Sequence, residues 1–159
     1  MKSKIIDGLN WRYATKKFDP KKKVSKKDID ELLEALRLSP SSYGLQPWKF
    51  LVITDRKVRE KLRSHGNNQP QVTDASHLIV LCARTDIDEK YIRKYIELII
   101  KTRCVTRESL KAYEGRMASV MKSKTHEERE EWARRQVYIA LGMLMSACEI
   151  GRASCRERV

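Results

Sequence analysis

Apolar residues recur at helical spacing along most of the chain. The clearest stripe runs from Ile29 to Leu36 at i, i+3, i+4 and i+7, and it predicts a helix that begins after Ser25 and ends before Pro40. Asp28 follows Ser25 at the spacing of a capping signal, in which the serine oxygen accepts an early backbone N–H. Similar spacing and capping residues predict five further helices, over residues 3–11, 55–63, 88–101, 107–121 and 125–148.

The last of these helices has a clear start and an unusual composition. Thr125 and Glu128 form a capping box, in which each side chain can bond to the other residue's backbone N–H. From Val137 to Cys148 nearly every residue is apolar. A helix that is apolar all round needs cover on every side, so we expect a central helix or a subunit interface.

Two continuous apolar runs, Phe50–Ile53 and His77–Ala83, predict strands. Runs of this kind are typical of strands that are covered on both faces. Two strands alone make a poor sheet, whereas the many helices imply a larger one. We therefore predict an α+β fold that is incomplete in this chain.

Composition narrows the class of protein. The chain has 159 residues, 41% hydrophobic and 35% charged, which suits one domain under a highly charged surface. No apolar run approaches the ~20 residues of a membrane span, and the N-terminus lacks the apolar stretch of a signal peptide, so we expect a cytoplasmic protein. The net charge of +13 favours phosphate-bearing ligands or nucleic acid. Acidic residues are mixed with the basic ones, which is more typical of solvated helix faces than of a nucleic-acid stripe.

Cysteine and histidine give no sign of a metal centre. The four cysteines contain no C-x-x-C pair, and the three histidines have no ligand spacing with one another or with the cysteines. We therefore expect neither a disulfide framework nor a metal site.

Two segments carry candidate chemistry. Arg12–Pro20 places one arginine and two lysines directly after the first predicted helix. Ser39–Phe50 reads Ser-Pro-Ser-Ser-Tyr-Gly-Leu-Gln-Pro-Trp-Lys-Phe, a run of hydroxyls, glycine and prolines that ends where a strand begins. Together they predict an anion-binding entry and a rigid loop against which a flat, polar-edged cofactor could lie.

These two segments resemble the nitroreductase family of FMN-dependent NAD(P)H oxidoreductases, and the resemblance covers residues 3 to about 150. It implies a three-layer α-β-α sandwich with a mixed, mainly antiparallel sheet, of which this chain holds about two strands and about six helices. It also implies a homodimer. Family members bind FMN and take electrons from NADH or NADPH.

The resemblance also assigns residues to the cofactor. Arg12 would serve the phosphate and ribityl end of FMN, and Lys16 would lie by the N1–C2=O edge and stabilise the reduced flavin. The Ser-Pro turn would pack on the flavin from the partner subunit, and Trp48 would be structural. Gln71 stands where some members have a lysine, so it can donate a hydrogen bond but brings no charge. The expected cofactor-binding residues are Arg12, Tyr13, Ala14, Lys16, Pro40, Ser41, Ser42, Gln46, Asn68 and Gln71.

The implied reaction is a ping-pong hydride transfer. NAD(P)H reduces flavin N5, and an electron-poor small molecule (a nitroaromatic, a quinone or a pteridine) then takes the hydride from the same face. This chemistry needs no acid–base dyad, and we assign no catalytic side chain. His77 is expected to be structural.

The C-terminal residues 151–159 have a different character. They resemble the translation of a sequencing-library adapter, and they contribute +2 to the net charge. We therefore expect a partial FMN-binding domain over 1–150, a non-native tail over 151–159, and weak or absent activity of a truncated chain; a natural basic tail is the alternative. Two other hypotheses are a small basic helical domain that binds nucleic acid, and an inert fragment.

Overall fold

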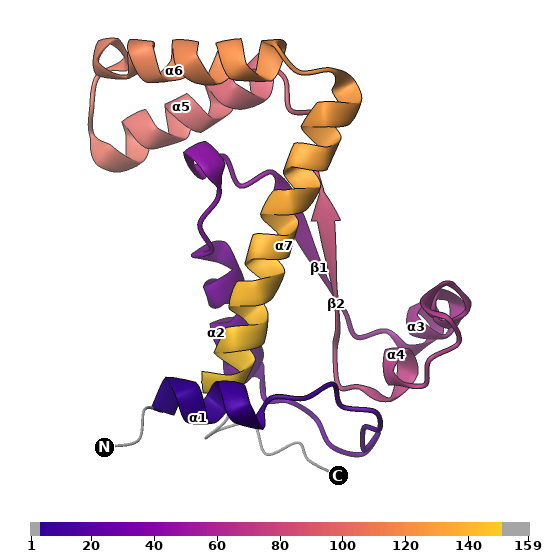
Figure 1. The fold of residues 1–159 in the computed structure, drawn as a ribbon. Helices are drawn as coiled ribbons and strands as arrows, with labels where there is room; N and C mark the ends of the chain where they lie inside the picture. Colours follow the sequence, from indigo (N-terminus) through magenta and orange to yellow (C-terminus); the bar gives the residue numbers. More distant parts are fainter. Residues whose placement is uncertain (1–3, 151–159) are drawn as a thin grey trace. The chain divides into compact units, whose positions relative to one another are not determined.

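The structure is a computed structural model that describes residues 4–150, so the predicted tail lies outside the described residues. These residues form an α+β fold with seven α-helices and two strands (Figure 1). The α-helices are α1 Lys4–Trp11, α2 Lys26–Arg37, α3 Arg56–Arg63, α4 Gln71–Asp74, α5 Glu89–Arg103, α6 Arg107–Lys122 and α7 His126–Ile150. The strands are β1 Trp48–Ile53 and β2 Leu78–Ala83, and short 3-10 turns lie at Ser42–Gly44 and Ser64–Gly66.

The two strands pair as an antiparallel sheet, as predicted, although β1 begins earlier than expected, at Trp48. The prediction that both strands are buried was wrong. All six side chains of β2 are half-buried, and Leu51 of β1 is 40% exposed. In a two-stranded sheet each strand has one unpaired edge, so neither strand is covered as an inner strand would be.

The chain divides into two compact units, which we describe separately. The first comprises, within the described residues, 4–39, 50–81 and 140–150. The second comprises Pro40–Lys49 and Cys82–Ile139.

Helix α2 of the first unit forms as its sequence predicts. The Ser25 hydroxyl accepts the Asp28 N–H at 3.1 Å, and Ile29 and Leu36 are buried. The helix ends at Arg37, before Pro40, and the buried Ser39 hydroxyl then donates to the Ala35 carbonyl at 3.0 Å. The start, the end and the buried face of this helix therefore follow from local residue choice.

The core of the second unit lies on α5 and α6, which run side by side (Figure 1). Ile92, Ile96 and Ile99 of α5 form the buried stripe, at i, i+4 and i+7. Leu98, an apolar residue of the same helix, is 60% exposed because it lies beside this stripe. The buried side chains of the cluster are Leu45, Ile87, Ile92, Ile96, Ile99, Met117, Met121 and Ala133.

Helix α7 keeps part of its apolar surface uncovered. Ala140 and Leu144 are buried, whereas Tyr138 and Met143 are 73% and 41% exposed. Among the helices of the described range, none combines the length and apolarity needed to cross a bilayer.

The capping box predicted for α7 is confirmed. The Thr125 hydroxyl accepts the Glu128 N–H at 3.2 Å, and the Glu128 carboxylate accepts the Thr125 N–H at 2.8 Å. Thr125→Ala is expected to lower the unfolding free energy by about 1 kcal/mol, because an early N–H of α7 loses its acceptor. Thr102→Ala, at an exposed position in the last turn of α5, is the control and should cause no loss in urea denaturation. Equal losses in the two variants would contradict this role of Thr125.

Candidate functional site

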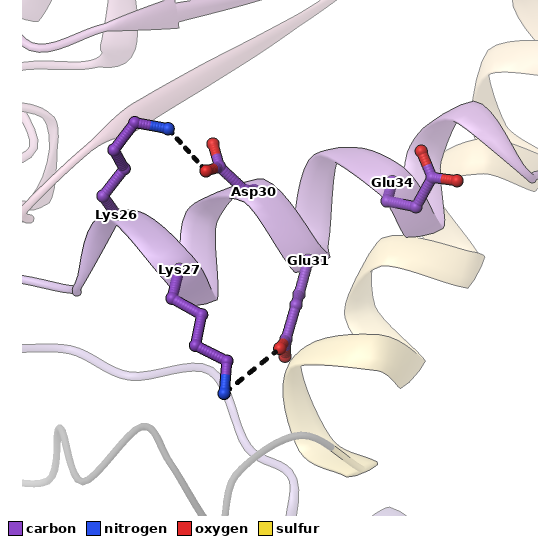
Figure 2. A pocket seen from close by; sticks show the side chains of 5 residues that line it. All are labelled: Lys26, Lys27, Asp30, Glu31 and Glu34. Atoms are coloured by element: carbon purple, nitrogen blue, oxygen red, sulfur yellow. Dashed lines mark hydrogen bonds and ion pairs between the residues drawn. The ribbon is translucent and has the colours of Figure 1, made fainter.

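One charged hollow, of about 610 Å³, lies along α2 and offers no free charge for chemistry (Figure 2). Lys26 Nζ lies 2.5 Å from Asp30 Oδ2, and Lys27 Nζ lies 3.9 Å from Glu31 Oε1. These side chains are exposed and pair at i, i+4, which is typical of a solvated helix face. Glu34, which also lines the hollow, accepts two hydrogen bonds from the Arg37 guanidinium, and these lower the pKa of its carboxyl.

The second unit carries the predicted Ser-Pro loop, residues 40–47, in a strained conformation. Tyr43 and Gln46 have left-handed φ angles of 57° and 47°, which are uncommon for residues other than glycine. Ser41 and Gln46 are brought together, because the Gln46 N–H donates to the Ser41 hydroxyl at 2.8 Å. Ser41 and Gln46 are half-buried, whereas Pro40 and Ser42 are exposed.

A buried amide on α7 holds this loop and was not expected from the sequence. Gln136 is 6% exposed, and its Oε1 accepts the Ser42 N–H at 2.8 Å. Its Nε2 donates to the Trp132 carbonyl at 3.2 Å, so the amide orientation is fixed. The only sequence signal was one uncharged polar residue next to an apolar stretch.

Three tyrosines of α5 and α6 also hold the Ser-Pro loop. The hydroxyls of Tyr95 and Tyr113 both donate to the Tyr43 carbonyl, at 2.9 and 2.7 Å. The Tyr91 hydroxyl lies 2.8 Å from the Leu45 carbonyl oxygen and 3.1 Å from that of Gln46. The helical spacing that predicts α5 gave no sign that Tyr91 and Tyr95 contact this loop.

A hollow of about 290 Å³ opens beside the same loop, lined by its Gly44–Gln46 stretch and by α5. Arg84 and Lys94 add positive charge to its wall. Arg84 is already engaged, because its Nη2 donates to Asp86 at 2.5 Å and its guanidinium lies 4.8 Å from the Tyr91 ring centroid.

The predicted phosphate-binding segment lies in the first unit as an irregular, exposed stretch. Arg12, Tyr13, Ala14 and Lys16 are all exposed. Within residues 4–150, no carboxylate forms an ion pair with Arg12 or Lys16. These two cations therefore remain available to an anionic ligand.

Asn68 and Gln71 also lie in the first unit, Asn68 on the turn that leads into α4 and Gln71 as the first residue of that helix. Asn68 has a left-handed φ of 56°, and its backbone is tied to Arg63 through its N–H at 3.0 Å and its carbonyl at 3.1 Å. Gln71 is half-buried, and its Oε1 has no hydrogen-bond partner among the described residues. Within the described residues, neither Asn68 nor Gln71 forms a hydrogen bond with Arg12 or Lys16.

A buried arginine fixes the end of α4 and influences the neighbouring histidine. Arg59 is 3% exposed and donates to the carbonyls of Thr73, at 2.9 Å, and Ala75. Burial, followed by the positive charges of Arg59 and Lys23, lowers the pKa of His77 from its usual value. His77 Nδ1 lies 2.9 Å from the Ser76 hydroxyl, which fits the structural role predicted for it.

The sequence profile described as "Nitroreductase family" matches residues 9–155. The chain belongs to the nitroreductase family. YfkO of Bacillus subtilis, which bears the name of an NAD(P)H nitroreductase, is 42% identical over 98% of this chain and 74% of its own length. The family resemblance of the Arg12 and Ser39 segments is thus confirmed.

Solved structures support the same fold. The nitroreductase ydfN from Bacillus subtilis matches with a TM-score of 0.78 and 20% identity, over 91% of this chain and 69% of that protein. A nitroreductase from Exiguobacterium sibiricum, solved in complex with FMN, matches with a TM-score of 0.74 and 22% identity, over 92% and 69%. The predicted nitroreductase-like α+β class is therefore confirmed.

Proposed function

We propose that this protein is an FMN-dependent NAD(P)H oxidoreductase that reduces an electron-poor small molecule, such as a nitroaromatic, a quinone or a pteridine. The observation that supports this most is the Ser-Pro loop. Its family-like sequence is held in a left-handed backbone conformation by hydrogen bonds from outside the loop. Strain that is held in place by surrounding structure is typical of ligand-binding sites.

The residues of the first unit suit the chemistry of FMN. Arg12 and Lys16 are exposed cations that pair with no carboxylate of residues 4–150, and a phosphate and an electron-rich ring edge each need such a cation. Gln71 Oε1 is a buried acceptor that no donor of the described residues reaches, and the flavin ring offers an N–H group at its pyrimidine edge. These are the residues that would hold the flavin in this unit.

The residues of the second unit would act on the flavin of a partner subunit. We infer that Pro40, Ser41, Ser42 and Gln46 line its ring, and that the protein is a homodimer. The uncovered apolar side chains of α7 support a dimer, since Tyr138, Ile139, Met143 and Met145 are 39–73% exposed.

Bound FMN would supply two-electron chemistry by accepting hydride from NADH or NADPH and passing it to the acceptor. The chain would supply binding, orientation and charge. Lys16 would stabilise the negative charge that develops at the N1–C2=O edge, and Gln71 would add a hydrogen bond there without a second charge.

Replacing Lys16 tests this function. The protein, expressed at the full length that its gene encodes, is expected to bind FMN and to oxidise NAD(P)H in the presence of a quinone. Lys16→Met is expected to slow this oxidation by about tenfold to a hundredfold at saturating FMN, since a cation facing developing charge is lost. Steady-state NAD(P)H absorbance is the measurement.

The neighbouring exposed lysine provides a matched control. Lys17→Met removes the same charge one residue away and is expected to leave the rate unchanged within about twofold. Equal losses in both variants would point to general surface charge. A wild-type protein that remains colourless after incubation with FMN would refute the proposed function. Retention of DNA by such a colourless protein at low salt would favour nucleic-acid binding instead.

A further inference from the structure

Four backbone N–H groups of the Ser-Pro loop, those of Ser42, Gly44, Leu45 and Gln46, bond within the loop or to α7. The Gly44 N–H donates to the Ser41 carbonyl at 2.8 Å, and the Leu45 N–H donates to the Ser42 carbonyl at 3.3 Å. The Ser42 and Gln46 N–H groups bond to Gln136 and to the Ser41 hydroxyl. These bonds fix the donors of the loop but leave several of its carbonyls to be satisfied from elsewhere.

Three tyrosine hydroxyls lie within hydrogen-bond distance of the carbonyl oxygens of Tyr43, Leu45 and Gln46. We call Tyr91, Tyr95 and Tyr113 the tyrosine clamp. Four contacts of 2.7–3.1 Å join it to the loop, and both lone pairs of the Tyr43 oxygen are engaged. Without them, the Tyr43 and Leu45 carbonyls would have no donor among the described residues, which is costly for groups in an apolar setting. The Gln46 carbonyl would keep the Trp48 N–H, which donates to it at 2.7 Å.

The clamp acts where the loop is most strained. Tyr43, Gly44 and Gln46 all have positive φ, and two of the three are not glycine. A residue other than glycine prefers ordinary backbone conformations over the left-handed one by a factor of about ten. The loop therefore keeps its conformation only if surrounding contacts hold it. Burial raises the pKa of Tyr91 and Tyr95, so both hydroxyls remain protonated donors over the physiological pH range.

We propose that the tyrosine clamp positions Ser41, Ser42 and Gln46 for the flavin, which makes the α5–α6 pair part of the cofactor site without contact to the cofactor. This rests on the proposed function. The three tyrosines are positioning residues, because they reach the loop only through its backbone carbonyls.

Tyrosine-to-phenylalanine changes test the clamp, because they remove the hydroxyl and keep the ring. The 6.3 Å contact between the Tyr43 and Tyr113 rings should therefore survive. The variants are Tyr91→Phe and the double variant Tyr95→Phe with Tyr113→Phe. Ser119→Ala, which removes an exposed hydroxyl from α6, is the control.

Two readouts are needed. Hydrogen exchange of the Gly44, Leu45 and Gln46 amides, in flavin-free protein, reports the loop itself. The double variant is expected to exchange these amides at least about tenfold faster, and Ser119→Ala to leave them unchanged. Flavin titration is expected to give a dissociation constant for FMN about tenfold higher in the double variant, together with an altered absorption spectrum of the bound flavin.

The combined exchange and flavin-binding results either support or overturn the tyrosine clamp. Faster exchange with weaker FMN binding and an altered flavin spectrum supports the clamp. Unchanged exchange overturns it, and so does faster exchange with unchanged FMN affinity and spectrum. If the wild-type protein binds no FMN, the proposed function fails and the positioning role falls with it, whereas the exchange data still show whether the tyrosines hold the loop.

Discussion

Replacing Arg59 with methionine is expected to lower the unfolding free energy by about 2–4 kcal/mol. The guanidinium is buried and donates to the carbonyls of Thr73 and Ala75, at the end of α4. Methionine fills similar space but leaves both carbonyls without a donor. Removing a buried cation offsets part of this loss, because Arg59 Nε has no hydrogen-bond partner among residues 4–150.

Arg56→Met is the matched control for this prediction. Arg56 lies on the same helix and pairs with Glu60 at 3.0 Å, and both side chains are more than half exposed. An exposed pair of this kind contributes about 0–1 kcal/mol, so urea denaturation should separate the two variants clearly. Similar unfolding free energies for both would show that the buried contacts of Arg59 contribute little.

The histidine next to Arg59 gives this prediction a second readout. Burial is the main reason that the pKa of His77 is lowered, and the charge of Arg59 is the next. In the folded protein His77 therefore takes up its proton at lower pH than in the unfolded chain. Its neutral form contributes stability above about pH 6.5, and this contribution declines as the pH falls below that value. Arg59→Met should raise the pKa of His77 and weaken this pH dependence, which NMR titration of the imidazole would measure.

Gly44→Ala is expected to have the second largest effect. Gly44 has a φ of 67°, and an added Cβ would lie 2.5 Å from Tyr95 Oη. The left-handed conformation costs an alanine about 1–2 kcal/mol, and the close contact must push the Tyr95 hydroxyl off the Tyr43 carbonyl. We expect a total loss of about 2–3 kcal/mol, measured by urea denaturation.

Two comparisons separate these causes. Gly115→Ala, within α6 where an added Cβ meets nothing within 4 Å, should raise stability by about 0.5–1 kcal/mol. In a Tyr95→Phe background the nearest atom to the new Cβ becomes Cζ, at 3.5 Å, which is ordinary van der Waals contact. Gly44→Ala should then cost only the backbone term. A cost that does not change in this background would exclude the steric part of the explanation.

Local signals in the sequence predicted the elements well. The Ser25 and Thr125 caps formed as expected, and the stripe from Ile29 to Leu36 faces the interior at both ends. Such features depend on residues three or four positions apart, so short sequence windows contain them. The family was also predicted from two short segments.

Contacts between distant residues could not be predicted in this way. Gln136 meets Ser42, 94 positions away, and Tyr113 meets Tyr43, 70 positions away. Nothing near either residue indicates its partner. The short helix α4 was missed for a related reason, since it is only four residues long and its end is held by the distant Arg59. The exposed Leu98 shows that an apolar residue at helical spacing can still lie outside the buried face.

The bond between Ser42 and Gln136 has a consequence for the newly made protein. A ribosome that adds about 5–20 residues per second needs roughly 5–20 s to travel from one residue to the other. During that interval the nascent chain already contains the Ser-Pro loop but not Gln136, whose side-chain amide holds the loop. Cofactor loading that depends on this loop would therefore have to follow translation of α7.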